Sequence, residues 1–305
     1  MPVPRNLTGT LKSIAQSAFA ASSHYDKYRP SFPPKPVQAL LDGLKISGVY
    51  GAKVIDLGAG TGKFTEVLAR RQEGYDIIAV EPHDDMRREL EQKKLVNVDV
   101  VKGYSTDMPV EEKSVDAVIA SQSPGIYCIS ATIVDSDQSI SSRFADESTL
   151  QEVHRVLRPK QYLGMIWNIE DYNAPREWNP TTSYEAKLKE IIWSLSDTEN
   201  RFRHNKWREV FERQGEKSAD ASDVAERRLF TYPLEETSVP FVANLPKDDV
   251  WNRMRSLSHI ANSTAEEQER IRDRVYEALN DKDAVNKDGL VSIHGKTYVA
   301  WTQAI

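Results

Sequence analysis

Residues 54–62 read V-I-D-L-G-A-G-T-G, an apolar run that passes directly into a turn with three glycines. An unbroken apolar run of this length is typical of a strand buried on both faces. Glycine at Gly58, Gly60 and Gly62 lets the backbone approach a ligand where a side chain would clash, and amides at the start of a following helix can hold a polar or anionic group. The pattern therefore predicts a strand–turn–helix unit of an α/β fold, either with a ligand at the turn or as a tight turn alone.

Apolar runs and amphipathic stretches alternate through the first half of the chain. The apolar runs predict strands at 53–57, 77–80, 98–101, 115–120 and 162–167. The amphipathic stretches predict helices at 63–71, 85–94 and 146–157. Strands and helices that alternate in this way predict a parallel sheet with right-handed crossover connections.

The second half of the chain is mainly helical in pattern. Helices are predicted at 184–195, 206–213, 247–261 and 265–279. Two strand-like segments, 227–232 and 296–300, are expected to close the far edge of the same sheet. We find no composition break, flexible linker or internal repeat, so a single domain is predicted.

Composition excludes several classes of protein. The 305 residues include 46 acidic and 40 basic side chains, a net charge of −6, which argues against bulk attraction to nucleic acid or to an anionic membrane. No stretch approaches the run of about 20 apolar residues that spans a bilayer. The polar N-terminus lacks the apolar core of a secretory signal, so a cytoplasmic location is expected.

The cysteine count limits the possible cofactors. Cys128 is the single cysteine, which excludes an internal disulfide and a multi-thiolate metal site. No group of Cys, His, Asp and Glu residues has the spacing of a metal site, so no metal is predicted.

Two acidic residues mark the ends of neighbouring predicted strands. Asp56 comes immediately before the glycines, and Glu81 follows the next strand, about 20 residues after the turn, where an acid in such folds binds ribose hydroxyls. A dinucleotide fingerprint would place its third glycine at position 63, which is Lys63 here. The glycine spacing and the preceding acid are unusual for dinucleotide-binding proteins, so NAD is the weaker choice of ligand.

The sequence resembles class I S-adenosylmethionine-dependent methyltransferases. D-L-G-A-G-T-G is similar to their motif I, and Glu81 matches their ribose-binding acid. G-Y-S-T-D-M-P at 103–109 resembles the segment that flanks the adenine, and S-V-D-A-V at 114–118 resembles the start of the fourth strand. The helix E-V-H-R-V-L-R-P at 152–159 continues the pattern. H-Y-D-K-Y-R-P-S-F-P at 24–33 resembles the N-terminal lid of a subgroup that includes trans-aconitate methyltransferases and related fungal small-molecule enzymes.

This resemblance implies a Rossmann-like α/β fold: a seven-stranded, mostly parallel sheet with helices on both faces and an antiparallel last strand. It also implies an N-terminal lid and helical C-terminal insertions. Within the single domain 1–305, residues 1–50 would form the lid and first helix. Residues 51–168 would form the cofactor-binding core, with an insert at about 124–142. Residues 169–305 would supply acceptor-side helices and the final strands.

The resemblance further implies S-adenosyl-L-methionine as cofactor. Gly58 and Gly60 would approach its methionine part, and Glu81 would accept from both ribose hydroxyls. Ser105 or Thr106 would lie beside the adenine. The complete implied cofactor-binding set is Tyr25, Tyr28, Arg29, Asp56, Gly58, Gly60, Gly62, Glu81, Ser105, Thr106 and Gln122. Tyr25, Tyr28 and Arg29 would close over the amino-acid end, or alternatively this segment only packs against the core.

The methyl acceptor is predicted from the chemistry of the transfer. A carboxylate is already ionised at pH 7, whereas a phenol, an alcohol or a protonated amine needs a base. Among the six histidines only His24, beside the lid tyrosines, is a candidate base. The sequence offers no evident base, and the subgroup includes carboxyl-methylating members. Both points favour a carboxylate oxygen of a small molecule as the methyl acceptor, in an enzyme of secondary metabolism.

Other functions were weighed against this one. Methylation of nucleic acid is disfavoured because S-Q-S-P-G stands at 121–125, where base-methylating enzymes have an Asp/Asn-Pro-Pro-aromatic motif. The alternatives are a cofactor-binding protein that transfers no methyl group and, less favoured, a nicotinamide oxidoreductase.

The insert at about 124–142 departs from the family pattern. It replaces an aromatic-histidine piece that would line the acceptor pocket, and the family pattern resumes at R-F-A-D-E, residues 143–147. Three interpretations remain open: a pocket loop that changes the acceptor, a loop that has abolished activity, or an intron translated in error. Cys128 lies inside this insert.

Overall fold

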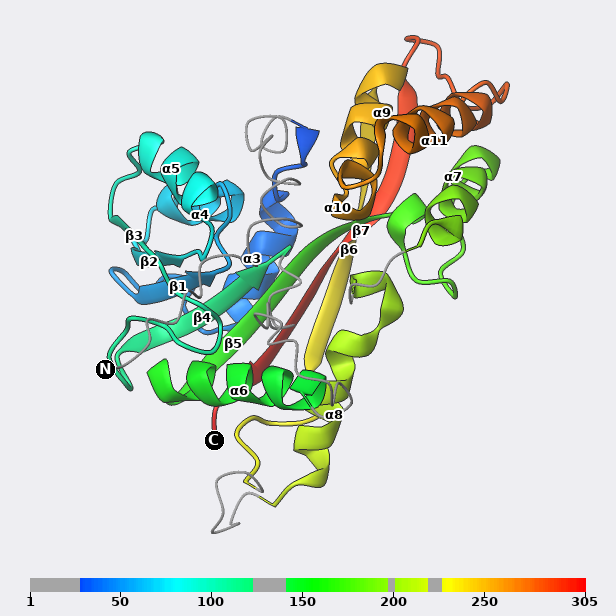
Figure 1. Ribbon diagram of the computed structural model, residues 1–305. Helices are drawn as coiled ribbons and strands as arrows, with labels where there is room; N and C mark the ends of the chain where they lie inside the picture. Colours follow the sequence, from blue (N-terminus) through cyan, green and yellow to red (C-terminus); the bar gives the residue numbers. More distant parts are fainter. Residues whose placement is uncertain (1–27, 123–140, 197–200, 219–226) are drawn as a thin grey trace, which may run out of the picture.

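A seven-stranded sheet forms the centre of the molecule (Figure 1). The computed structural model describes residues 28–122, 141–196, 201–218 and 227–305. The strands in chain order are β1 (Lys53–Leu57), β2 (Asp76–Val80), β3 (Val98–Val101), β4 (Val115–Ser121), β5 (Leu157–Glu170), β6 (Glu235–Leu245) and β7 (Val291–Gln303). Their order across the sheet is β3-β2-β1-β4-β5-β7-β6.

Strands β1 to β5 pair in parallel, and β7 runs antiparallel to both of its neighbours, β5 and β6. The predicted Rossmann-like, mostly parallel sheet with an antiparallel last strand is therefore confirmed. Because β1, β2 and β4 run in one direction, their carboxyl ends meet at one edge of the sheet, which is where ligands bind in open α/β folds.

Helices cover both faces of the sheet. They are α3 (Pro34–Gly43), α4 (Lys63–Ala69), α5 (Asp84–Gln92), α6 (Ser141–Val156), α7 (Ser183–Ser194), α8 (Glu209–Glu216), α9 (Lys247–Arg255), α10 (Ser258–Ala261) and α11 (Ala265–Ala278). In the part of the chain described, none of the helices is both long and apolar enough to cross a membrane.

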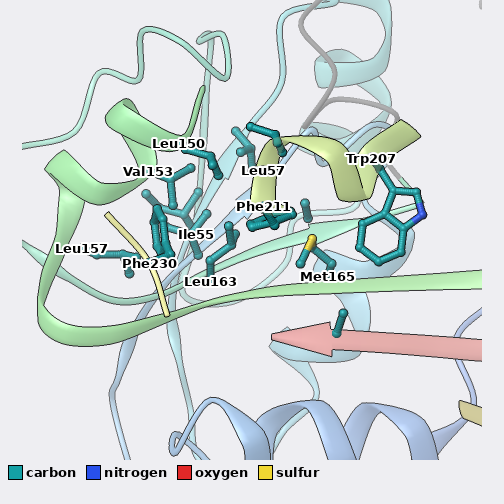
Figure 2. Packing of buried hydrophobic residues seen from close by; sticks show 14 of the residues in the cluster. Ile55, Leu57, Leu150, Val153, Leu157, Leu163, Met165, Trp207, Phe211 and Phe230 are labelled. Carbon is teal, nitrogen blue, oxygen red and sulfur yellow. The ribbon is translucent and has the colours of Figure 1, made fainter. Parts of the chain in front are cut away.

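Consecutive residues of the central strands contribute to different core layers. Val54 of β1 packs with α3 and α4, whereas the next residue, Ile55, packs on the opposite face with α6 and α8. Figure 2 shows the second layer, where Leu150 of α6 and Phe211 of α8 meet Ile55 and Leu163. This burial on both faces explains why the strand sequences are apolar throughout.

A separate apolar cluster lies beyond the carboxyl ends of the parallel strands. It joins α7, α9, α10 and α11 to the beginning of β7, where Val291 and Ile293 are fully buried. Figure 1 shows these helices stacked above β6 and β7, on the other side of the N-terminal segment from α4 and α5. Of the predicted helices of the second half, those at 184–195, 247–261 and 265–279 therefore assemble beyond the carboxyl ends of the parallel strands, whereas α8 packs on the sheet face beside α6.

Two predictions for the second half are wrong. The segment 227–232 forms only isolated bridges, Ser218 with Arg227 and Phe230 with Ala304. Its apolar residues fill the core, because Phe230 is fully buried in the layer under α6. The true edge strand is β6, which pairs with β7 alone and alternates between exposed and half-buried residues.

The predicted helix 247–261 is interrupted. Helix α9 ends at Arg255 and α10 begins at Ser258, with Leu257 between them in an extended conformation. This break turns the chain around the end of α9, close to the N-terminal segment, where Arg29 Nη2 donates to the Ser256 carbonyl at 3.4 Å.

The buried side chain of Asn168 joins segments that are far apart in the sequence. Its Nδ2 donates to the Ser31 carbonyl at 3.2 Å, and its Oδ1 accepts from the Thr297 hydroxyl at 2.7 Å. Its backbone N–H and carbonyl bond the side-chain amide of Gln122 at 2.6 and 3.2 Å. The N-terminal segment, the end of β4, β5 and β7 therefore meet at one residue.

Replacing Asn168 by alanine should destabilise the fold by about 1–3 kcal/mol, because the fully buried Thr297 hydroxyl then lacks its acceptor. The bonds to Gln122 use the Asn168 backbone and should persist. Urea denaturation of Asn168→Ala, Thr297→Val and the double variant measures the effect. The double variant should lose less stability than the two single losses summed, and simple additivity would contradict the coupling.

Candidate active site

The glycine turn adopts a conformation that favours glycine at each predicted position. Gly58, Gly60 and Gly62 have φ values of 69°, 58° and 87°. A Cβ at Gly62 would lie 2.2 Å from the Leu90 Cδ1 atom, so this glycine is needed for packing of α4 against α5. Among the described residues, a Cβ at Gly60 would meet only Met86 Sδ, at 3.8 Å. The positive φ of Gly60 therefore explains the glycine at this position better than packing against the described residues does.

The turn is fixed by hydrogen bonds to the end of β2. The N–H groups of Gly58 and Ala59 donate to the Val80 carbonyl at 2.8 and 3.1 Å. The N–H of Gly60 donates to Glu81 Oε2 at 2.8 Å, and the N–H of His83 donates to Glu81 Oε1 at 2.9 Å. Glu81 therefore holds the glycine turn and the start of α5 together.

Glu81 retains capacity to bind a ligand. Its side chain is almost fully buried, and this desolvation raises the pKa of its carboxyl above the ordinary value. A carboxylate has about four acceptor positions, and the hydrogen bonds from Gly60 and His83 use two of them. The role that the sequence predicts for Glu81, accepting hydrogen bonds from the ribose hydroxyls, stays a prediction.

Asp56 is a second buried carboxyl at the same edge. Its Oδ2 accepts from the Thr65 hydroxyl at 2.6 Å, while its buried Oδ1 has no hydrogen-bond partner among the described residues. Burial raises the pKa of Asp56 to about 7, the Thr65 hydroxyl opposes that rise, and the nearby Glu81 charge adds to it. Two buried acids at adjacent strand ends suit a ligand that carries positive charge and hydroxyl groups.

The predicted adenine segment lies at the end of β3. Ser105 Oγ bonds the Thr149 hydroxyl of α6 at 3.0 Å, and Tyr104 and Asp107 exchange backbone hydrogen bonds at 3.0 and 3.1 Å. Ser105 and Thr106 are both half-buried. The turn is therefore anchored at the same edge as the glycine turn, and its contact with adenine stays a prediction.

Gln122 has a structural use that the sequence did not reveal. It follows the last residue of β4 with φ 48°, and both polar atoms of its side-chain amide bond the backbone of Asn168. These bonds fix the relative position of the ends of β4 and β5. A direct cofactor contact of Gln122 stays a prediction.

The N-terminal segment that is predicted to form a lid is described from residue 28 onward. His24 and Tyr25 lie outside the described residues, as does the insert from 124 to 140 with Cys128. Tyr28 and Arg29 are half-buried, and Arg29 reaches the carbonyl of Ser256 beyond α9. The structure thus brings Arg29 next to the end of α9, and its contact with the cofactor stays a prediction.

Sequence reasoning missed a group of charged residues on the acceptor side. Glu170 ends β5 and Arg253 lies in the last turn of α9, with Arg253 Nη1 at 3.7 Å from Glu170 Oε1. Burial raises the pKa of the neighbouring Tyr172 hydroxyl well above its usual range; Glu170 adds to this rise, and Arg253 and Arg29 oppose it. No local motif marks these residues, and only the tertiary fold brings 170 and 253 together.

A carboxylate–histidine pair lies next to this group. The fully buried Glu185 of α7 accepts from the His294 N–H at 2.6 Å, from His294 Nδ1 at 2.9 Å and from the Thr182 hydroxyl at 2.7 Å. The buried carboxyl group of Glu185 therefore accepts three hydrogen bonds from the protein. In the described ranges no three His, Cys, Asp or Glu residues gather in an arrangement that could hold a metal ion.

Known proteins with similar sequences are methyltransferases. Residues 55–165 match the model of a methyltransferase domain family. The chain is 28% identical over 248 residues to an uncharacterized methyltransferase-like protein of Schizosaccharomyces pombe, an alignment covering 81% of this chain and 79% of that one. It is 37% identical over 156 residues to an uncharacterized methyltransferase of Staphylococcus carnosus, covering 51% of this chain and 72% of that one. The matches to two other curated relatives cover 52% and 57% of the length of those proteins.

A solved structure shares the architecture. It comes from Anaeromyxobacter dehalogenans and is described as a candidate type II methyltransferase; it has a TM-score of 0.54 and 14% sequence identity, and the match covers 90% of this chain and 97% of that one. The fold is accordingly that of the Rossmann-like methyltransferases. With the sequence matches, the chain belongs to the class I S-adenosylmethionine-dependent methyltransferase family. The narrower resemblance to trans-aconitate methyltransferases stays a prediction.

The raised pKa of Asp56 should make stability fall as pH rises. In the folded protein this carboxyl keeps its proton up to about pH 7, whereas in the unfolded chain it ionises near 3.8. The unfolded state therefore binds fewer protons between these values. Ionisation should cost on the order of 4 kcal/mol of unfolding free energy from about pH 4 to pH 8.

Denaturant unfolding of wild type and Asp56→Asn across this pH range tests the prediction. Asparagine does not titrate, so the variant should become progressively more stable relative to wild type as pH rises. The matched control is Asp76→Asn, which changes an exposed residue at the start of β2. A constant stability difference between Asp56→Asn and wild type would show that Asp56 is ionised throughout.

Proposed function

We propose that this protein transfers a methyl group from S-adenosyl-L-methionine to a carboxylate oxygen of a small metabolite. The observation that carries the cofactor assignment is the bond from the Gly60 N–H to the buried Glu81 carboxylate, which joins the open glycine turn to a ribose-binding acid. Family membership supports the same cofactor. When bound, S-adenosyl-L-methionine supplies a methyl group on a positively charged sulfur, which makes that carbon open to displacement.

Several residues of the predicted cofactor-binding set would each lie next to a different part of the cofactor. Gly58 and Gly60 would face its methionine part, since neither carries a side chain. Glu81 would accept from the ribose hydroxyls, and Asp56 would lie close to the positively charged part. Ser105 and Thr106 would border the adenine from the end of β3.

The protein's main contribution to methyl transfer would be positioning. Holding two reactants at reacting distance and angle is worth on the order of 7–11 kcal/mol of the barrier. Beside the last pair of β4 with β5, the described polar residues Ser121, Gln122 and Asn168 carry hydroxyl and amide groups, which are not bases near neutral pH; the carboxylate of Glu170 lies further along β5 and faces Arg253. These neighbours favour an acceptor that is already ionised, and a carboxylate meets this condition.

The cofactor site is tested by removing the Glu81 charge. Glu81→Gln should weaken binding of S-adenosylhomocysteine by roughly 10- to 150-fold, because hydrogen bonds to a charged acceptor contribute about 1.5–3 kcal/mol. Calorimetry measures the affinity, and the exposed Glu91→Gln on α5 is the matched control. An unchanged affinity in Glu81→Gln would contradict this placement. Binding of NAD in preference to S-adenosylhomocysteine would favour the oxidoreductase alternative.

The acceptor class is tested by the chemistry of the product. Methyl-tritiated S-adenosylmethionine is incubated with the protein and a mixture of small organic acids, and the product is treated with alkali. A methyl ester of a carboxylic acid releases volatile methanol under these conditions, whereas methyl ethers and methylamines do not. We expect alkali-labile tritium that depends on the protein. Tight cofactor binding with no transfer to any acid, alcohol or amine would favour the alternative of a non-methylating protein.

A further inference from the structure

Three segments converge on the acceptor side of the site. Strand β5 continues four residues past its last pair with β4, Ser121 with Ile166, and ends at Glu170. Helix α9 brings Arg253 to this end, and the N-terminal segment reaches the same place through Arg29 and the Ser256 carbonyl. Figure 1 shows α9 and α10 above the end of β5, beside the first described N-terminal residues.

Arg253 and Glu170 form an incomplete ion pair. Arg253 is 8% exposed and Glu170 is 1% exposed. Arg253 Nη1 lies 3.7 Å from Glu170 Oε1, beyond hydrogen-bonding distance. Among the described residues, no hydrogen-bond partner is found for Arg253 Nε, Arg253 Nη1 or Glu170 Oε1.

Such an arrangement is unfavourable for a purely structural pair. Burying two charges has a desolvation cost that good geometry and further hydrogen bonds must offset. The nearby Glu185 shows how this protein satisfies a structural buried carboxylate, with three donors at 2.6–2.9 Å. Arg253 lacks comparable acceptors at two of its three guanidinium nitrogens.

We infer that Arg253, balanced by Glu170, binds a carboxylate group of the methyl acceptor and thereby selects the acceptor. This inference rests on the proposed function. A planar guanidinium presents several N–H donors to the two oxygens of a carboxylate, which gives both attraction and orientation. Arg29 brings a second guanidinium to this region, where its Nη2 donates to the Ser256 carbonyl just beyond α9.

The carboxylate held by Arg253 is not the one that is methylated. The attacking oxygen loses its negative charge as the new C–O bond forms and the bond from the methyl carbon to sulfur breaks. A guanidinium bound to that oxygen would stabilise the reactants more than the transition state and would slow the transfer. Arg253 therefore orients the acceptor through a second carboxylate, while the reacting carboxylate faces the methyl group.

Calorimetry on the full-length protein saturated with S-adenosylhomocysteine tests this assignment. Succinate, glutarate and citrate are titrated separately as probes. We expect at least one to bind wild type, with affinity reduced about tenfold or more in Arg253→Gln. Arg255→Gln, on the exposed face of the same helix, should stay within about twofold of wild type. Wild type that binds S-adenosylhomocysteine but none of the acids would overturn the inference and leave the cofactor assignment intact.

A second variant separates recognition from folding. Arg253→Lys keeps the positive charge near Glu170 but loses the planar fork, so it should melt close to wild type and still bind the acids more weakly. If Arg253→Gln does not fold, the Arg253→Lys variant alone still tests whether Arg253 binds the acids. If both variants lose thermal stability while the folded protein binds the acids with wild-type affinity, Arg253 is structural and the inference is wrong.

The carboxylate could instead belong to the amino-acid end of the cofactor. Affinities for S-adenosylhomocysteine and for 5′-methylthioadenosine, which lacks that end, distinguish the two sources. We expect Arg253→Gln to change neither affinity. A selective loss of S-adenosylhomocysteine affinity would assign Arg253 to the cofactor and overturn the inference. Wild type that binds no S-adenosylhomocysteine would contradict the proposed function itself, and with it this inference.

Discussion

The Glu81 carboxylate determines the geometry of the whole cofactor side. It is buried at the end of β2 and bonds two backbone N–H groups, one in the glycine turn and one at the start of α5. Burial of a carboxylate is tolerated only when donors surround it, and backbone donors cannot turn away as side chains can. Asp56 lies at the end of the adjacent strand and is also buried, so the protein keeps two poorly solvated acids at one edge. Ribose hydroxyls and a positively charged cofactor would stabilise both groups, which makes this edge selective under the proposed function.

The charged groups described on the two sides of the candidate site differ. Asp56 and Glu81 lie at the ends of β1 and β2, whereas the guanidinium groups of Arg29 and Arg253 lie by α9 together with the carboxylate of Glu170. Under the proposed function, the two acids would lie nearer the positively charged methyl donor, and the guanidinium groups nearer a carboxylate of the acceptor. In a partly buried site such interactions are less screened than on the surface, so they can determine which molecule binds where. The long strand β5 makes this possible, because it extends beyond β4 into the helical layer.

Local sequence predicted the fold of the half that carries the glycine turn well and the fold of the second half less well, for physical reasons. The parallel strands are buried on both faces, so their apolar runs are unmistakable, and the glycine turn requires residues with positive φ. Strand β6 was missed because it lies at the edge, pairs only with β7 and contains Pro240. The segment that contains Phe230 was wrongly predicted to be a strand, because an apolar residue can fill a core without belonging to a strand. Contacts such as that of Glu170 with Arg253 depend on chain segments 83 positions apart, a separation that no local pattern records.

Asn168 connects the chain segments that carry the two halves of the candidate site. Its side chain bonds the N-terminal segment at Ser31 and β7 at Thr297, and its backbone bonds Gln122 at the end of β4. A shift of any of these segments would break hydrogen bonds at a residue that is 2% exposed, where water cannot readily replace them. The positions of Arg29, on the N-terminal segment, and Glu170, two residues after Asn168, are therefore fixed relative to the end of β4. Methyl transfer requires donor and acceptor to be held at a defined distance, and this shared amide is the connection through which the fold can hold them.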